Sequence, residues 1–270
     1  MSVERDALDR IDALGLPWYV TGSWALAAYA EPRMTRDIDV VLDATRADYE
    51  SPLRPAFEAD FLVNDPIDLG SRWMGGLIHR TELVRVDLMF GRSDTWSRSA
   101  MARRHRLEHP TLGPIWVISV EDLVVAKLEW SEGTSELQLR DVRSIVRLVD
   151  DLDWAYLDRG TLRPSASVTD WRRSVAVDQG QARFDERLRE VGPDARMRIH
   201  AQMYRDAFLY VWAQADRAAP MTEPELARFL LRRLYPDLEG ARLDAIMTRL
   251  EAEWHAGTWT GFVRPSQEAR

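Results

Sequence analysis

Two aspartates, Asp37 and Asp39, stand two residues apart at the head of the segment DIDVVLD. β-branched residues fill this segment and no helical period fits it, so it predicts a strand. Because side chains alternate across a strand, both carboxylates should share one face, with Ile38 on the other. A hard divalent cation relieves their repulsion, since it takes carboxylate oxygens and leaves places for substrate phosphates. The alternative is that Asp37 caps a turn and Asp39 ends an exposed strand.

Two nearby features could belong to the same site. Gly22-Ser23 lies where a predicted strand turns into a helix, so backbone N–H groups and the helix dipole would face an anion there. The alternative is a simple helix cap. Asp87 is embedded in the apolar run LVRVDLMF, and buried carboxylates are rare unless they are paired or metal-bound. Asp87 is therefore a third metal ligand, or one half of an ion pair with Arg85 or Arg36.

Lys127 is the only lysine, since every other basic residue among the 36 lysines and arginines is an arginine. It lies in VVAKLEW, an apolar turn of a predicted helix. An ammonium is a compact point charge and a guanidinium is a planar fork, so this lysine marks either chance or a position that needs the point charge. The alternative is a surface lysine whose stem covers the helix while its charge reaches solvent.

Together these residues offer a phosphate cradle, three carboxylates and a cation, which is the equipment for nucleotidyl transfer. Three carboxylates can hold two metal ions that clamp the attacking and leaving oxygens, while backbone N–H groups hold a triphosphate. Without metal, each converging pair of carboxylates would cost about 1–4 kcal/mol. Asp87→Asn should therefore raise the melting temperature of the metal-free protein. If Asp87 forms an ion pair, the same change should lower that temperature or leave it unchanged.

The elements that must position these groups change character along the chain. Strands and helices alternate as far as residue 118 and helices alone follow, which favours a catalytic domain of both kinds of element and then an α-helical domain. Ser119 and Asp122 have the spacing of a capping box. Gly, Pro and Ser accumulate over residues 158–167, which predicts a boundary there. The predicted strands cover residues 17–21, 37–43, 83–90 and 113–118, and the predicted helices cover residues 4–14, 24–30, 46–59, 121–130, 135–150, 194–218, 222–235 and 240–257.

The composition, 46% apolar and 30% charged among 270 residues, is that of a soluble globular protein. No apolar run approaches the about 20 residues of a membrane span, and the acidic first residues are unlike a signal or transit peptide. There is no cysteine for a disulfide or a thiolate metal site. We therefore expect a cytoplasmic location and no membrane partner.

The net charge of −8 argues against a nucleic-acid coat or scaffold. It leaves room for an enzyme that meets RNA through a local basic patch. One basic run, residues 97–110, either receives nucleic-acid phosphates or is a solvated charge run. It contains Arg98, Arg103, Arg104, His105, Arg106 and His109.

Gly22-Ser23, Asp37-Ile38-Asp39 and Asp87 resemble the motifs of the nucleotidyltransferase superfamily of the DNA polymerase β type. More narrowly, the pattern TGSWALAAY…PRMTRDIDVVL…VRVDLM…ISVEDLVVAKLEW…SELQLRDVRSIV is similar to the AbiEii/AbiGii toxin family over roughly residues 1–160. The resemblance implies an α+β fold. A nucleotidyltransferase-fold domain with a small mixed sheet flanked by helices would occupy residues 1–160, and an α-helical domain of unknown role would occupy residues 161–270.

The resemblance also gives roles to individual residues. Asp141 in LQLRDVRSI matches the aspartate of a motif that follows the lysine motif, although it could equally lie on a helix surface and pair with Arg140 or Arg143. Arg33 is preferred to Arg36 as a triphosphate ligand, because Arg36 should face away from the carboxylates in a regular strand. The candidate metal ligands are Asp37, Asp39 and Asp87; the candidate nucleotide-binding residues are Gly22, Ser23, Arg33 and Lys127; and the candidate catalytic residues are Asp37, Asp39, Asp87, Lys127 and Asp141.

The resemblance implies an enzyme that uses Mg²⁺ (or Mn²⁺) to move a nucleoside monophosphate from an NTP to an acceptor hydroxyl, with release of pyrophosphate. Its narrower form implies the toxin of a toxin–antitoxin pair, with RNA such as tRNA as acceptor and an antitoxin protein from a neighbouring gene as partner. Two alternatives stay open. One is a small-molecule (aminoglycoside-like) nucleotidyltransferase, because an acidic helical domain would suit a polycationic drug. The other is a catalytically inactive binding module, which the intact carboxylate set disfavours.

Overall fold

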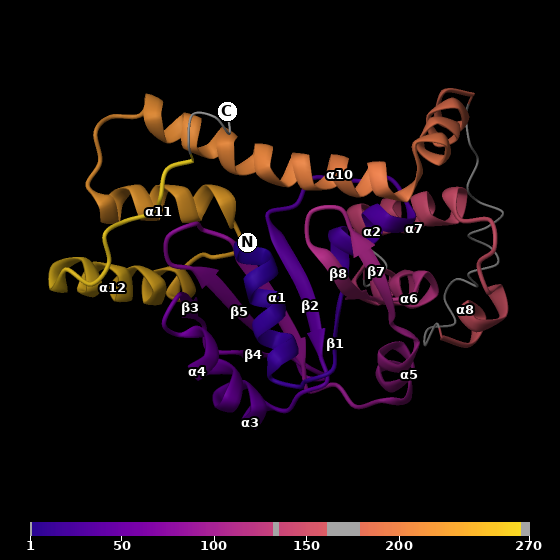
Figure 1. Cartoon of the computed structure of the whole chain (residues 1–270), viewed down its shortest axis with the longest axis horizontal. Helices are drawn as coiled ribbons and strands as arrows, with labels where there is room; N and C mark the ends of the chain where they lie inside the picture. The colour runs from indigo at the N-terminus through magenta and orange to yellow at the C-terminus, as the bar shows by residue number, and fades with distance from the viewer. Residues whose placement is uncertain (1, 132–134, 161–178, 266–270) are drawn as a thin grey trace.

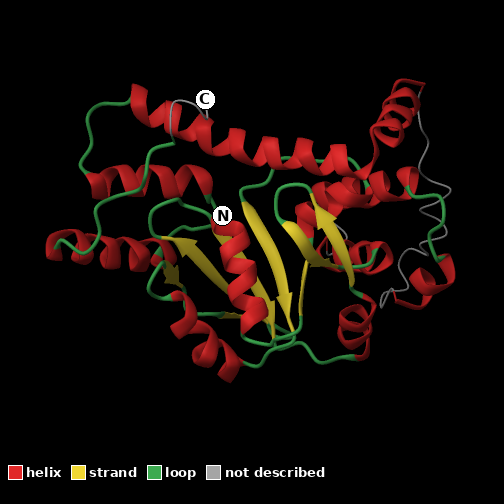
Figure 2. Cartoon of the chain, in the orientation of Figure 1, coloured by secondary structure: helices red, strands yellow, loops and turns green. Residues whose placement is uncertain are grey.

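The computed structural model describes residues 2–131, 135–160 and 179–265. Its strands are β1 (Trp18–Val20), β2 (Asp37–Leu42), β3 (Phe61–Val63), β4 (Ile67–Asp68), β5 (Trp73–His79), β6 (Arg85–Phe90), β7 (His105–His109) and β8 (Gly113–Val117). They form one mixed sheet in the order β3-β5-β6-β2-β1-β8-β7, with β4 paired to β5 (Figure 2). β2 runs parallel to β6, and β1 runs parallel to β8. The other pairs are antiparallel.

Helices flank this sheet, and a group of longer helices follows it (Figure 1). They are α1 (Val3–Ala13), α2 (Gly22–Tyr29), α3 (Arg46–Asp48), α4 (Arg54–Phe57), α5 (Thr95–Arg103), α6 (Val120–Ser131), α7 (Glu136–Leu148), α8 (Trp154–Gly160), α10 (Gln179–Arg217), α11 (Glu223–Leu234) and α12 (Ala241–Ala256). The predicted α+β class and helix-flanked mixed sheet are confirmed. The strands β3, β4, β5 and β7 and the helices α5 and α8 were not expected.

The alternation along β2 decides which face of the sheet carries the candidate site. Ile38, Val40 and Leu42 are buried in the core that α1 forms against the sheet. The intervening positions face the other side, where Val41 packs against the core that α2, α6 and α7 form. The side chains of the aspartate pair therefore lie on the face that α2 and α6 cover.

The helices α10, α11 and α12 pack against two separate parts of the sheet and its flanking helices. α10 lies along α2, where Arg196 donates to the backbone oxygen of Ala28 over 2.7 Å. α11 and α12 form a core with Ile78 and Leu83, at the β5–β6 end of the sheet. The division at residue 160 stays a prediction, since most of the predicted boundary lies outside the described residues. None of the described helices combines the length and apolar character that a membrane crossing requires.

Candidate active site

The parallel pairing of β2 and β6 brings the aspartates of the two strands together. Asp39 is the register neighbour of Asp87, and Asp37 is the register neighbour of Arg85. Residues at alternate positions of adjacent strands share a face, so the three carboxylates and Arg85 lie on one side of the sheet. The spacing in the sequence alone predicts that Asp37 and Asp39 share a face. The pairing of β2 with β6, which adds Asp87, becomes visible only in the fold.

Gly22 brings the first turn of α2 against the Asp39 carboxylate. Its φ of 64° lies in the left-handed region, and a Cβ at this position would stand 1.8 Å from Oδ2 of Asp39. The backbone N–H of Thr21 donates to the backbone oxygen of Asp39 over 2.9 Å, which holds the turn in place. Only glycine fits this approach. The N-terminus of a helix therefore lies beside a carboxylate, an arrangement that suits a metal-bound phosphate between them.

A cavity of about 630 Å³ opens in front of these groups. Five of the candidate site residues line it, namely Gly22, Arg33, Asp39, Asp87 and Lys127. Ser23, Asp37 and Asp141 are not among the described residues that line it. Ser23 is buried. Asp37 is half-buried and accepts a short hydrogen bond from the Thr35 hydroxyl.

Burial strongly raises the pKa of two of these carboxyl groups. Burial, together with Asp37 and Asp87, raises the pKa of Asp39 to about 7, against the opposing charges of Lys127 and Arg33. Burial also raises the pKa of Asp87 to about 6, although its contact with Arg85 opposes the shift. A divalent cation would remove this conflict.

The donors fit one divalent cation better than two. Mg²⁺ is commonly held by one or two carboxylates together with substrate phosphates. Asp37 and Asp39 could supply the carboxylates, and an NTP could supply the phosphates. Within the described residues, however, no group of three acidic or histidine side chains is placed to hold a metal ion. Both oxygens of Asp87 accept from Arg85 instead, over 2.7 and 2.8 Å. The alternative to a metal ligand, an ion pair of Asp87 with Arg85, is therefore present, and Arg36 donates instead to the backbone oxygen of Arg233.

Lys127 is buried, with 3% of its surface exposed, so it is not a surface lysine. Its Nζ donates to Oδ2 of Asp141 over 2.7 Å and to Gln138 over 3.3 Å. Nε of Arg33 donates to the same Oδ2 over 3.0 Å. Burial lowers the pKa of Lys127, and Asp141 opposes that shift. Asp141 therefore positions two cations at the cavity wall rather than pairing on the helix surface with Arg140, which contacts Glu31 instead.

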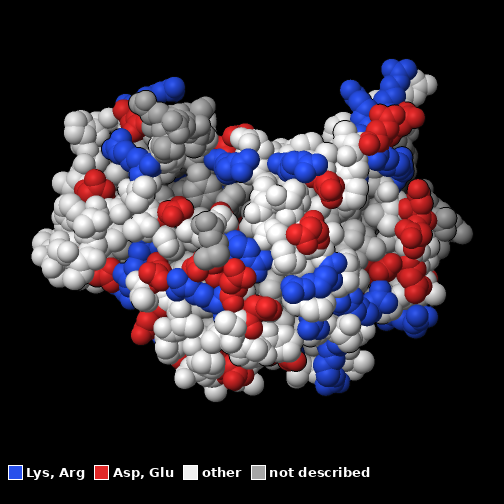
Figure 3. Space-filling model, viewed as in Figure 1, with Lys and Arg blue, Asp and Glu red and all other residues white. Residues whose placement is uncertain are grey.

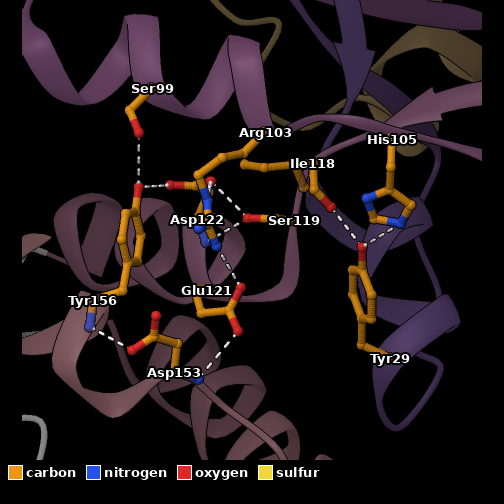
Figure 4. A network of polar contacts seen from close by, with 10 residues as sticks. All are labelled: Tyr29, Ser99, Arg103, His105, Ile118, Ser119, Glu121, Asp122, Asp153 and Tyr156. Atoms are coloured by element: carbon orange, nitrogen blue, oxygen red, sulfur yellow. Dashed lines mark hydrogen bonds and ion pairs between the residues drawn. The ribbon is translucent and has the colours of Figure 1, made fainter.

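A buried polar network fixes the helix that carries Lys127 (Figure 4). Asp122, fully buried in the first turn of α6, accepts from the Ser119 hydroxyl over 2.6 Å, and the Asp122 N–H donates back to Ser119 over 3.2 Å. The same carboxylate accepts from Nε of Arg103 on α5, over 3.1 Å, and from the Tyr156 hydroxyl on α8. The predicted cap residue Asp122 therefore links α6 to α5 and α8. These contacts set the direction in which α6 presents Lys127 to the cavity.

Arg72, Arg92, Arg98, Arg104, Trp96 and Trp130 line one side of the cavity, called its outer wall below. Some of these residues could not be found from the sequence. Guanidinium groups stack on two indoles there, Arg92 on Trp96 at 4.6 Å and Arg72 on Trp130 at 5.0 Å. Arg72 precedes β5 and Trp130 lies on α6, so no spacing in the sequence marks that pair. From the basic run of residues 97–110, Arg98 and Arg104 line the cavity, whereas Arg103 pairs with acidic residues of α6 and His109 is buried.

Neutralising Asp39 should stabilise the metal-free protein. The folded-state pKa of Asp39 lies above the unfolded value of about 3.9, so its ionisation destabilises the fold increasingly as the pH rises from about 4 to 7. Asp39→Asn should raise the melting temperature in EDTA near neutral pH by a few degrees. Asp87→Asn should lower it, since Arg85 would lose its main partner. Thermal melts decide this, and a lower melting temperature for Asp39→Asn would contradict it.

Two buried histidines should make the protein sensitive to acid. His200 of α10 and His109 of β7 pack on the indole of Trp24, with ring centroids 4.8 and 5.3 Å away. Burial lowers the pKa of His200 to about 3 and that of His109 to about 4. Because these values lie below the unfolded value of about 6.5, the stability contribution is complete above that pH and is lost as the pH falls. We expect a loss of about 2 kcal/mol per histidine at about pH 5.

Urea unfolding at neutral and acidic pH measures this loss. His200→Leu should flatten the pH dependence, whereas His255→Gln, at an exposed position of α12, should leave it unchanged. Equal pH dependence in His200→Leu and wild type would assign the acid sensitivity to other groups.

Comparisons with known proteins come from structure alone, since no family model and no curated protein matches the sequence. An antigenic nucleotidyltransferase-like protein from Paracoccidioides brasiliensis is 16% identical, with a TM-score of 0.39, over 53% of this chain and 73% of the other. ANT(2″)-Ia in complex with adenylyl-2″-tobramycin is 16% identical, with a TM-score of 0.36, over 53% and 88%. Lincosamide antibiotic adenylyltransferase LnuA, lincomycin-bound, is 15% identical, with a TM-score of 0.34, over 54% and 96%. These values are too low to assign an activity or a ligand to this chain.

Proposed function

We propose that this protein is a metal-dependent nucleotidyltransferase, which moves a nucleoside monophosphate from an NTP to an acceptor hydroxyl and releases pyrophosphate. The observation that carries the proposal is the approach of Gly22, at the start of α2, to the Asp39 carboxylate inside a cavity that also contains Lys127. A helix N-terminus, a carboxylate and an ammonium around one cavity are suited to a metal–triphosphate.

In this mechanism the residues of the chain bind and orient the donor. Asp37 and Asp39 would hold Mg²⁺ or Mn²⁺, which when bound neutralises charge on the triphosphate and the attacking oxygen. The N–H groups at the start of α2, beginning near Gly22 and Ser23, would donate to phosphate oxygens. Lys127 and Arg33, both anchored on Asp141, would face the remaining phosphate charge.

We infer that the acceptor is an anionic, base-bearing molecule, and RNA such as tRNA fits that description. The outer wall of the cavity supports this inference, because four arginines and two tryptophans line it. Arginine binds phosphate and stacks on bases, and aromatic rings stack on bases in single strands. Arg72 and Arg92 are paired with Glu129, so the unfavourable charge that a polycationic drug would meet at this wall comes from Arg98 and Arg104. The residues that line this wall are Arg72, Arg92, Arg98 and Arg104, with Trp96 and Trp130.

The face of the molecule drawn in Figure 3 is not a broad nucleic-acid platform. On the face drawn in Figure 3, acidic and basic side chains are interspersed among the described residues, with no continuous basic area. A short RNA end reaching into the cavity suits this pattern better than a long duplex. As part of the same proposal, the protein acts in the cytoplasm as the toxin of a toxin–antitoxin pair.

The proposal is tested by incubating the purified chain with each labelled NTP, Mg²⁺ and one acceptor. The acceptors are total RNA, purified tRNA, and a panel of aminoglycosides and lincosamides. We expect metal-dependent labelling of RNA and pyrophosphate release, both absent in EDTA. Labelling of a drug alone would establish the small-molecule alternative, and NTP binding without transfer to any acceptor would establish the inactive module.

A further inference from the structure

Arg85 is a buried cation that lies between the candidate site and the C-terminal helices. Its Nε and Nη2 donate to the two oxygens of Asp87, over 2.7 and 2.8 Å. Its Nη1 donates over 2.8 Å to Asp237, which follows α11. The guanidinium also lies 5.3 Å from the ring centroid of Tyr235, whose hydroxyl donates to the backbone oxygen of Leu83.

This arrangement blocks Asp87 as a metal ligand. A carboxylate that receives two N–H donors from one guanidinium is held in a bidentate pair, the strongest geometry for this contact. Asp87 must leave Arg85 before both of its oxygens can face a cation at Asp39. Release without a replacement would leave a buried guanidinium unpaired, which is strongly unfavourable.

Asp237 is placed to make that release tolerable. It already accepts from Nη1 of Arg85 over 2.8 Å, and its side chain is 50% exposed. A guanidinium has five N–H groups, and the Tyr235 ring continues to cover its face. Arg85 can therefore stay neutralised after Asp87 turns away.

We propose that Arg85 is a positioning residue that holds Asp87 in the metal-free protein and transfers its pairing to Asp237 when a divalent cation enters beside Asp39. This rests on the proposed function for the identity of the site. This exchange gives the C-terminal helices a role. Asp237, the residue after α11 that pairs with Arg85, then sets the affinity of the metal site. No bond forms or breaks covalently, since only hydrogen-bond partners and metal ligands exchange.

Mn²⁺ binding to the full chain without nucleotide, followed by the paramagnetic signal of free Mn²⁺, tests this proposal. Asp237→Asn should weaken Mn²⁺ binding by about tenfold. Arg85→Gln should strengthen it by a similar factor, because Asp87 is then free. Glu239→Gln is the matched control, since it removes one exposed negative charge from the same loop. Asp237→Glu should restore wild-type binding. Circular dichroism verifies that each variant is folded.

The outcomes separate this proposal from the proposed function when transfer is measured on the same samples. Mn²⁺ binding by Asp237→Asn equal to that of Glu239→Gln, in a protein whose wild type binds Mn²⁺ and transfers nucleotide, would overturn the role of Arg85 alone. Wild-type Mn²⁺ binding without transfer to any acceptor would overturn the function and leave the pairing exchange standing on its own result. Absence of Mn²⁺ binding in every variant would overturn both. Because Asp237 is half-exposed, its variant keeps the test decisive even if Arg85→Gln does not fold.

Discussion

Replacing Asp39 by alanine is expected to lower nucleotidyl transfer by about 10²–10³-fold or more, the scale for losing a principal electrostatic contact. Asp39 lines the cavity, contacts the start of α2 and is the register neighbour of Asp87, so its loss would remove the group that we propose as the main ligand of the cation. Asp37→Ala should behave alike. Neither change should unfold the protein, because each removes repulsion between carboxylates.

The measurement is kcat/KM for NTP consumption with an excess of whichever acceptor becomes labelled, together with a thermal melt of each variant. Asp65→Ala is a suitable control, because its side chain is 92% exposed and it pairs with Arg54 away from the cavity. Turnover at the wild-type level in either Asp37→Ala or Asp39→Ala would remove this site as the catalytic centre.

Lys127→Met is expected to lower transfer by about 10²-fold, and Lys127→Arg should be only a partial substitute. The methionine removes the ammonium from the cavity wall and leaves Asp141 to Arg33 alone. The arginine carries the charge, but its planar group must share one carboxylate oxygen with Arg33, so it will displace Arg33 or enter the space that the triphosphate needs. Lys127→Met should also destabilise the fold by up to about 3 kcal/mol, since it breaks one arm of a buried ion pair.

NTP titrations and urea unfolding of both variants measure these two effects. Arg140→Lys provides a control for changing the type of cation, since Arg140 lies on α7 with a side chain that is 63% exposed. Full activity and unchanged NTP affinity in Lys127→Arg would make the single lysine a compositional accident.

The features predicted correctly from the sequence are those whose signals span only a few residues. The alternation of DIDVVL places two carboxylates on one face of the strand. Spacing alone also suggested that Ser119 and Asp122 cap a helix. In each case the groups that interact are near neighbours in the chain, so local geometry decides the result.

The features that were missed depend on partners far away in the sequence. Arg85 and Asp237 are 152 residues apart, and Arg33 and Asp141 are 108 apart, so no local pattern reports either contact. β5 was missed because Gly75-Gly76 interrupts its apolar alternation. The first of these glycines is explained only by the fold, since a Cβ there would stand 2.4 Å from the ring of Tyr49.

The single buried lysine makes this chain a one-site reporter for amine-directed chemistry. An acylating reagent applied to the folded protein can react with one side-chain amine only, and that amine is paired with Asp141 at the cavity wall. The intact mass of the product therefore reports whether Lys127 has been acylated, once the constant contribution of the amino-terminal amine is subtracted. Occupancy of the cavity can be followed by mass spectrometry in this way, without adding a label to the protein.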